Sequence, residues 1–144
     1  MTISARQKQL VQQTLRQVAP LAETASALYY MRLFELDPSL RAVFTPDLQV
    51  QSRKLLSMIA YNRDGLEYSE TLILSLHQLG RRFAENGLIP SDYETVGDAL
   101  LWTLARGLGA AFTAEVREAW EAVYGLLSDV AIEASAPVKK VEAA

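Results

Sequence analysis

The sequence predicts an all-α fold in a single domain, and three observations support this class. Hydrophobic residues recur at the three- and four-residue spacing of an amphipathic helix along most of the chain, whereas the alternation typical of strands is scarce. Capping residues and prolines divide the chain into helical segments. The 144 residues, half of them hydrophobic, suffice for the core of one ordinary domain. We expect roughly six to eight helices of unequal length, which is less regular than an up-and-down bundle.

Caps and prolines delimit the N-terminal helices. Ser4 and Gln7 form a capping box, which opens a first helix that ends before Pro20. Pro20 suits the first turn of a second helix. Asp37, followed by a proline, then caps a short helix that ends near Phe44.

The middle of the chain is predicted to contain two helices joined by a polar loop. We expect Asp47 to cap a helix over about residues 48–61, and we expect residues 62–69 to form the loop. The next helix covers about residues 69–86. It ends in Gly87, which is a good left-handed C-cap.

Two long helices complete the predicted domain. Ser91 and Glu94 form a second capping box, and Thr113 caps the last helix. The remaining residues have the composition of a frayed, solvated end. We therefore place the folded domain at residues 1–134 and a flexible tail at residues 135–144.

Composition and charge exclude several classes of function. The formal net charge is −3, so no basic surface for nucleic acid is expected. The chain has no cysteine, which excludes disulfides, a thiol nucleophile and a cysteine-bound metal. No apolar run resembles a signal peptide or a membrane span, so we expect a cytoplasmic protein. The absence of a Ser-His-Asp set, of HExxH and of glycine-rich nucleotide motifs argues against an independent enzyme.

Two stripes of side chains are predicted to face one pocket from neighbouring helices. Each stripe repeats at three- and four-residue spacing, so its members share one helix face. The first stripe begins and ends with an amide, which is unusual for a face that points to a core. The stripes consist of Gln51, Leu55, Met58 and Asn62, and of Leu72, Leu76, Leu79 and Phe83.

The only histidine of the chain, His77, does not belong to the second stripe. Six residues at about 100° each place His77 roughly 240° around the helix from Phe83. We therefore expect Phe83 to pack in the core, and His77 to lie at the surface or the rim of the pocket.

Five stretches together resemble a known family. They read YYMRLFELDPSLRAVF, QSRKLLSMI, LGRRF, DYETVGDALLWTL and FTAEVREAWEAVYG, and they occur in this order between about Ser4 and Glu133. In order and spacing the chain resembles a bacterial single-domain haemoglobin, the globin branch that also forms the head of flavohaemoglobins. The resemblance implies a globin fold, with haem b held between the Gln51–Leu55 helix and the Leu72–Phe83 helix.

The resemblance also implies roles for individual side chains around that haem. Phe44 occupies the position of the aromatic residue that stacks against the porphyrin, and Tyr30 that of the distal tyrosine that hydrogen-bonds iron-bound oxygen. Gln51 falls at the distal polar position, with Leu55 one turn further on, over the ring. Tyr93 matches the tyrosine that forms a hydrogen bond near the proximal ligand. The remaining residues placed around the haem are Lys54 and Arg82 near the propionates, and Met58, Leu79 and Phe83 in the two stripes.

The chain departs from the family at the proximal ligand. The family motif reads Gly-Arg-Arg-His, whereas this chain has a phenylalanine, Phe83, in place of the histidine. A phenyl ring has no lone pair and cannot ligate iron. The glutamate that supports the histidine in the family falls near Ser135, with Glu133 two residues earlier. Tyr30 could ligate ferric iron as a phenolate, and the thioether of Met58 is a weaker candidate.

Two hypotheses about function follow. The first is a haem pocket for a diatomic gas, O₂ or NO, with non-standard iron ligation; redox chemistry would then need an external reductase. The second is a haem-free globin-fold module that senses or binds an apolar small molecule or a protein partner. The sequence leaves association into a homodimer open, and it does not distinguish a natural Phe83 from an engineered one.

Overall fold

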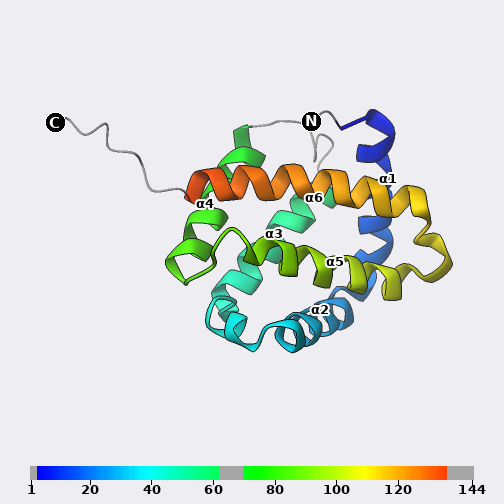
Figure 1. Ribbon diagram of the computed structural model, residues 1–144. Coiled ribbons are helices and arrows are strands. Elements are labelled where there is room, and N and C mark those ends of the chain that lie inside the picture. Colours follow the sequence, from blue (N-terminus) through cyan, green and yellow to red (C-terminus); the bar gives the residue numbers. More distant parts are fainter. Residues whose placement is uncertain (1–2, 62–69, 136–144) are drawn as a thin grey trace.

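The computed structural model describes residues 3–61 and 70–135, and these residues form helices and their connections (Figure 1). The α-helices are α1 (Ala5–Val18), α2 (Ala22–Leu36), α3 (Pro46–Tyr61), α4 (Glu70–Glu85), α5 (Asp92–Leu108) and α6 (Ala114–Ser135). Three 3₁₀ helices link them: η1 (Ala19–Leu21), η2 (Pro38–Ala42) and η3 (Gly109–Ala111). The predicted all-α class is confirmed, since the described ranges contain no strand.

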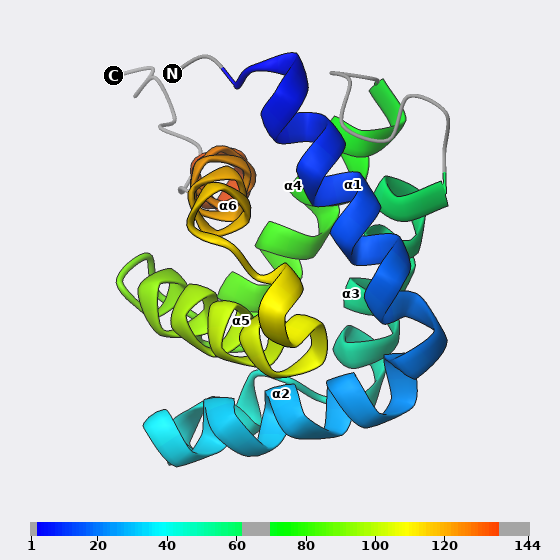
Figure 2. The same cartoon turned by 90° about the vertical axis from the view of Figure 1, so that its right-hand side faces the viewer.

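The helices cross one another in layers and do not run side by side. The long helix α6 packs on α1 and α4, while α2 packs on α5 and α3 packs on α4 and α1. Figure 2 looks almost along α6 and shows α5 between α6 and α2. No helix in the described part of the chain is both long enough and apolar enough to cross a membrane.

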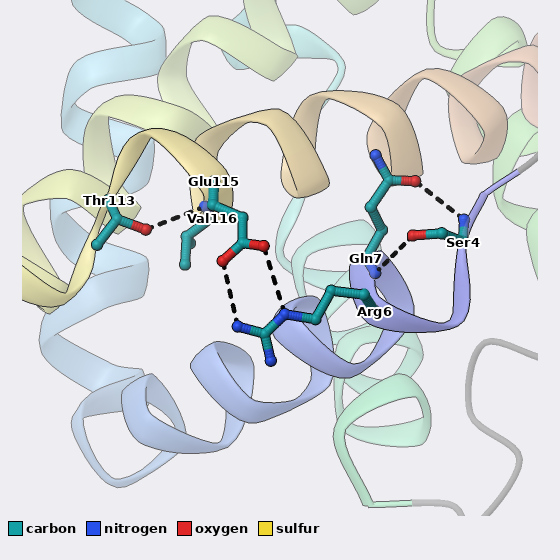
Figure 3. Close-up of polar contacts among 6 residues, drawn as sticks. All are labelled: Ser4, Arg6, Gln7, Thr113, Glu115 and Val116. Carbon is teal, nitrogen blue, oxygen red and sulfur yellow. Dashed lines mark hydrogen bonds and ion pairs between the residues drawn. The ribbon is translucent and has the colours of Figure 1, made fainter.

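The predicted caps of α1 and α6 are confirmed (Figure 3). The backbone N–H of Gln7 donates to Ser4 Oγ, and the backbone N–H of Ser4 donates to Gln7 Oε1, each at 3.0 Å. The hydroxyl of Thr113 accepts from the backbone N–H of Val116 at 3.2 Å. These bonds satisfy N–H groups that have no partner within the first turn of a helix.

An exposed ion pair joins the starts of these two helices. Arg6 Nη2 lies 3.2 Å from Glu115 Oε1, and the hydrogen bond to Glu115 raises the pKa of the Arg6 guanidinium (Figure 3). More than half of each side chain is exposed, so water screens the pair and it contributes little to stability.

Two further predictions of helix ends are confirmed. The carboxylate of Asp37 accepts from the backbone N–H of Ser39 at 3.0 Å, although the helix it caps is the short η2, which ends at Ala42. Gly87 follows α4 with φ +106°, a left-handed conformation that favours glycine. Pro20 lies in η1, so α2 begins two residues later than predicted.

Two predicted caps are wrong. Thr45, and not Asp47, precedes α3, and its hydroxyl accepts from the backbone N–H of Leu48 at 3.5 Å. Ser91 has helical dihedrals, φ −65° and ψ −22°, so its side chain does not cap α5 and the predicted capping box does not form. The carboxylate of Asp92 instead accepts from the backbone N–H of Ile89 at 3.0 Å. The predicted loop at 62–69 and the tail after residue 135 lie outside the described residues.

The core consists of two hydrophobic clusters. The first lies between α1, α3, α4, α5 and α6, and the second lies between α2, η2, α3, α4, α5 and α6. Leu55 packs against both clusters. Within the first cluster the indole N–H of Trp120 donates to the hydroxyl of Thr14 at 2.9 Å, so these buried polar groups satisfy each other.

Glycine allows α4 and α6 to approach closely. A Cβ atom added at Gly80 would lie 2.4 Å from the backbone oxygen of Ala131. This contact is far shorter than van der Waals distance, so the crossing requires a residue without a side chain. The crossing fixes the position of the α4 stripe relative to α6.

Candidate ligand-binding cavity

A cavity of about 230 Å³ lies between the two core clusters. All six α-helices contribute to its walls, which are mostly aliphatic and aromatic. It touches α3 and α4, as predicted, and it extends further toward α1, α5 and α6. Sequence analysis did not identify this extension, because its lining residues have the pattern of ordinary core residues.

A chain of aromatic rings forms one wall of the cavity. The rings of Tyr29 and Tyr30 meet edge to face with centroids 4.9 Å apart, and Tyr30 lies 5.8 Å from Phe44. Phe44 in turn lies 5.0 Å from Phe83, with the two planes tilted by 49°. Such pairs add attraction beyond the area they bury, so this wall is a continuous packed unit.

The structure agrees with the predicted orientation of α4. Phe83 is 7% exposed and lies in the cavity wall together with Leu76 and Leu79. His77 is half-buried and is not part of that wall. The ring at position 83 therefore faces the cavity, and the imidazole does not.

Four tyrosines of the described part of the chain line the cavity, and their hydroxyls differ in the hydrogen bonds that they form. The hydroxyl of Tyr29 donates to the backbone oxygen of Val96 at 3.4 Å, and that of Tyr124 donates to the backbone oxygen of Tyr93 at 2.6 Å. The hydroxyl of Tyr93 is buried and has no partner in the described residues. The same residues offer no hydrogen bond to the hydroxyl of Tyr30.

Burial keeps these phenols protonated at neutral pH. It raises the pKa of Tyr93 to about 12. It also raises the pKa of Tyr30 to about 12, against an opposing effect of the nearby Arg53 cation. Burial raises the pKa of Tyr29 and Tyr124 further above the usual range. The phenols around the cavity are therefore neutral hydroxyl groups and not phenolates.

The predicted site residues divide into two groups. Tyr30, Phe44, Leu55, Leu79, Phe83 and Tyr93 come together in the cavity wall. Gln51, Lys54, Met58 and Arg82 do not line it. Met58 packs against the first core cluster, and Lys54 is exposed. The part each would play toward a haem stays a prediction.

Gln51 and Arg82 connect α3 with α4 outside the cavity. Arg82 Nη1 donates to Gln51 Oε1 at 2.6 Å. Gln51 and Tyr30, the two polar residues expected on the distal side of a haem, form no hydrogen bond with each other among the described residues. The amide that opens the α3 stripe is therefore engaged at the rim.

Two of the polar cavity residues were missed by sequence analysis. Tyr124 lies on α6, and Arg53 lies one position from the predicted Lys54 on α3. Neither stood out in the sequence, because both look like ordinary residues of an amphipathic helix. The described residues contain no group of three or more His, Cys, Asp or Glu side chains that could hold a metal ion.

Comparison with known proteins gives consistent relatives. The Globin family profile matches residues 27–131. A flavohemoprotein of Halalkalibacterium halodurans is 28% identical over 135 residues, which cover 92% of this chain and 33% of that protein. A neuroglobin of Tetraodon nigroviridis is 27% identical over 139 residues, and the match covers 87% of this chain and 87% of the neuroglobin. The chain therefore spans about a third of the flavohemoprotein and most of the neuroglobin.

Solved structures show the same fold. An engineered carbene transferase from Rhodothermus marinus superposes with a TM-score of 0.79 at 24% identity, covering 94% of both chains. A flavohemoglobin from Malassezia yamatoensis, determined with bound FAD and heme, superposes with a TM-score of 0.74 at 23% identity. That match covers 92% of this chain and 36% of the flavohemoglobin. These likenesses confirm the fold that the sequence resemblance implies.

Proposed function

This chain belongs to the globin family, and from that premise we propose that its cavity binds a small apolar molecule and does not carry a histidine-ligated haem. The proposal concerns the domain that we place at residues 1–134. We propose that it acts in the bacterial cytoplasm, the location expected from the sequence. The observation that carries it is the direct contact between Phe44 and Phe83.

Haem is the group that the family implies, and the contact between Phe44 and Phe83 tests whether the cavity fits it. Carbon atoms in contact lie about 3.5 Å apart, so rings on opposite faces of a porphyrin stand about 7 Å apart. The centroids of Phe44 and Phe83 are only 5.0 Å apart, which leaves no layer between them. Phe83 also offers iron no lone pair. The residues present therefore do not fit a haem held in the family's manner.

The size and the walls of the cavity suit a smaller ligand. An engineered apolar cavity of about 150 Å³ binds benzene. The cavity of this chain measures about 230 Å³ and has mostly hydrophobic walls. By that comparison it accommodates a molecule of one or two rings, whose burial supplies the main driving force for binding.

A second candidate is a haem protein of altered ligation that handles O₂ or NO. Tyr30 favours it, because this phenol lines the cavity without a partner among the described residues. A tyrosine can hold ferric iron as a phenolate. This candidate requires Phe44 and Phe83 to separate, and it requires Tyr30 to ionise against a pKa that burial raises to about 12. Redox chemistry would depend on an external reductase.

Binding experiments with two ligands test the proposal. The purified chain is titrated with hemin and, separately, equilibrated with naphthalene across a dialysis membrane. We expect stoichiometric uptake of naphthalene, no stoichiometric Soret band, and no rise of the melting temperature with hemin. A Soret band at one equivalent of hemin supports the second candidate. A protein that takes up neither ligand contradicts both.

A further inference from the structure

The hydroxyl of Tyr93 is a buried hydrogen-bond donor that lacks an acceptor among residues 3–61 and 70–135. Tyr93 is 8% exposed and lines the cavity. Its hydroxyl is one of two buried side-chain atoms without a partner in the described residues. The other, Nε of Arg32, belongs to a guanidinium that lies over the ring of Trp102, 5.3 Å from its centroid. Among the described residues, no interaction of this kind compensates for the missing hydrogen bond of the Tyr93 hydroxyl.

The surroundings of Tyr93 explain why its hydroxyl has no partner. Tyr93 belongs to the second core cluster together with Phe44, Leu79 and Phe83, whose side chains contain no acceptor. Its own backbone oxygen already accepts from Tyr124. Because a buried donor without a partner lowers stability, the cavity wall contains an unfavourable group to which a suitable ligand can offer an acceptor.

Tyr93 differs in this respect from the other tyrosines of the cavity. Tyr29 and Tyr124 donate to backbone oxygens of α5. Tyr30 is not among the residues with a buried, unpaired atom, and it lies close enough to Arg53 for that charge to act on its phenol. Burial raises the pKa of Tyr93 to about 12, so at neutral pH the group donates.

Building on the proposed function, we infer that the cavity selects a neutral molecule of one or two rings with one accessible hydrogen-bond acceptor, to which Tyr93 donates. A heteroaromatic nitrogen or a carbonyl oxygen meets this requirement. A charged ligand does not, because the apolar walls would strip water from it without compensation. A site with a desolvated donor discriminates against an isostere that lacks the acceptor.

Quinoline and naphthalene are a matched pair of probes for this inference. They share one shape and differ by a ring nitrogen that accepts a hydrogen bond. Both absorb in the ultraviolet, so equilibrium dialysis measures their dissociation constants without a label. We expect the chain to bind quinoline about three- to tenfold more tightly than naphthalene, the usual range for one net hydrogen bond.

Two variants identify the donor. In Tyr93→Phe, quinoline should lose its advantage and bind no more tightly than naphthalene, while naphthalene binding persists. In the control Tyr30→Phe, which removes the other unpartnered phenol of the cavity, the preference for quinoline should persist. If the preference survives in Tyr93→Phe, or disappears in Tyr30→Phe, the assignment of Tyr93 is overturned.

The failure of this inference is distinguishable from the failure of the proposed function. Equal affinity of the unmodified chain for the two probes refutes the acceptor requirement and leaves the apolar pocket standing. Failure of both probes to bind refutes the pocket itself. Naphthalene uptake by Tyr93→Phe, together with its circular dichroism spectrum, shows that the variant has folded.

Discussion

The hydroxyl of Tyr93 has no partner in the described residues, and this leads to a prediction about stability that does not depend on any ligand. Tyr93→Phe keeps the ring and removes a buried donor without a partner in the described residues. Such a group lowers stability by about 1–3 kcal/mol, so the substitution should raise the free energy of unfolding by that amount. The matched change Tyr124→Phe removes a hydroxyl from the same cavity, but this one donates to a backbone oxygen at 2.6 Å. It should lower the free energy of unfolding by about 0.5–1.5 kcal/mol.

Thermal unfolding resolves these changes. For 144 residues, an unfolding entropy of roughly 2.1 cal/mol/K per residue gives about 0.3 kcal/mol/K. Tyr93→Phe should therefore raise the melting temperature by about 3–10 °C, and Tyr124→Phe should lower it by about 2–5 °C. Scanning calorimetry without ligand measures both shifts. A lower melting temperature for Tyr93→Phe, or shifts of one sign for the two variants, would refute the reasoning.

Three other predictions test the haem interpretation, the α4–α6 crossing and the buried phenols. Phe83→His should take up one equivalent of hemin and bind carbon monoxide after reduction, because histidine supplies a lone pair to iron. Phe83→Leu frees space without supplying a lone pair and should take up no hemin. Hemin uptake by the leucine variant would show that space, and not iron ligation, limits binding. Gly80→Ala should lower the free energy of unfolding, measured in urea, by about 1–3 kcal/mol, because its Cβ would lie 2.4 Å from a backbone oxygen. Gly125→Ala, whose Cβ would meet no atom within 4 Å, should raise it by about 0.5–1 kcal/mol. The prediction is wrong if the free energy of unfolding changes in the same direction in both variants. Burial raises the pKa of Tyr30 and Tyr93 from 10.0 to about 12, so the unfolded chain ionises at these phenols before the folded one does. The free energy of unfolding should therefore be constant below pH 10 as far as these groups are concerned and fall as the pH rises toward 12; urea unfolding should show this fall, and a smaller one in Tyr93→Phe.

Helix faces could be predicted from the sequence because they depend on local geometry. A rotation of about 100° per residue places Phe83 with the leucines of its stripe and His77 away from them, whatever lies opposite. The structure has this arrangement, with Phe83 in the cavity wall and His77 outside it. The capping box at Ser4 was predictable for the same reason, since every atom involved lies within four residues.

The residues that each helix face contacts on neighbouring helices could not be predicted in this way. Gln51 begins a stripe whose next two members, Leu55 and Met58, pack against the core, yet the partner of Gln51 is Arg82 on another helix. A pattern within α3 carries no information about where Arg82 lies. The error at Ser91 has a similar origin: Asp92, one residue on, accepts the backbone N–H that precedes the helix, and Ser91 adopts helical dihedrals. Serine and aspartate both favour the start of a helix, and the sequence alone does not decide which of two adjacent side chains is engaged there.

The cavity itself was out of reach for a further reason. Residues such as Val11, Leu15 and Leu127 line it, and in sequence they are indistinguishable from side chains that fill a core. Whether a buried side chain touches a neighbour or a void depends on how the volumes of all six helices add up. That sum is a property of the assembled structure, so the sequence predicted a pocket between two helices and missed its extension.

The hydroxyl of Tyr93 should lower the stability of the protein and strengthen its binding of a ligand that has an acceptor. Folding already removes this hydroxyl from water, so a ligand with an acceptor gains a hydrogen bond without desolvating a protein group. Tyr93→Phe should therefore give a more stable protein that has lost its preference for an acceptor, whereas a purely structural tyrosine would lose stability on the same change. The haem candidate predicts no such trade-off in the haem-free chain, because uptake there depends on separating Phe44 from Phe83. A melting temperature and a pair of dissociation constants, measured on one variant, thus separate an acceptor-selective pocket from a globin that has merely lost its histidine.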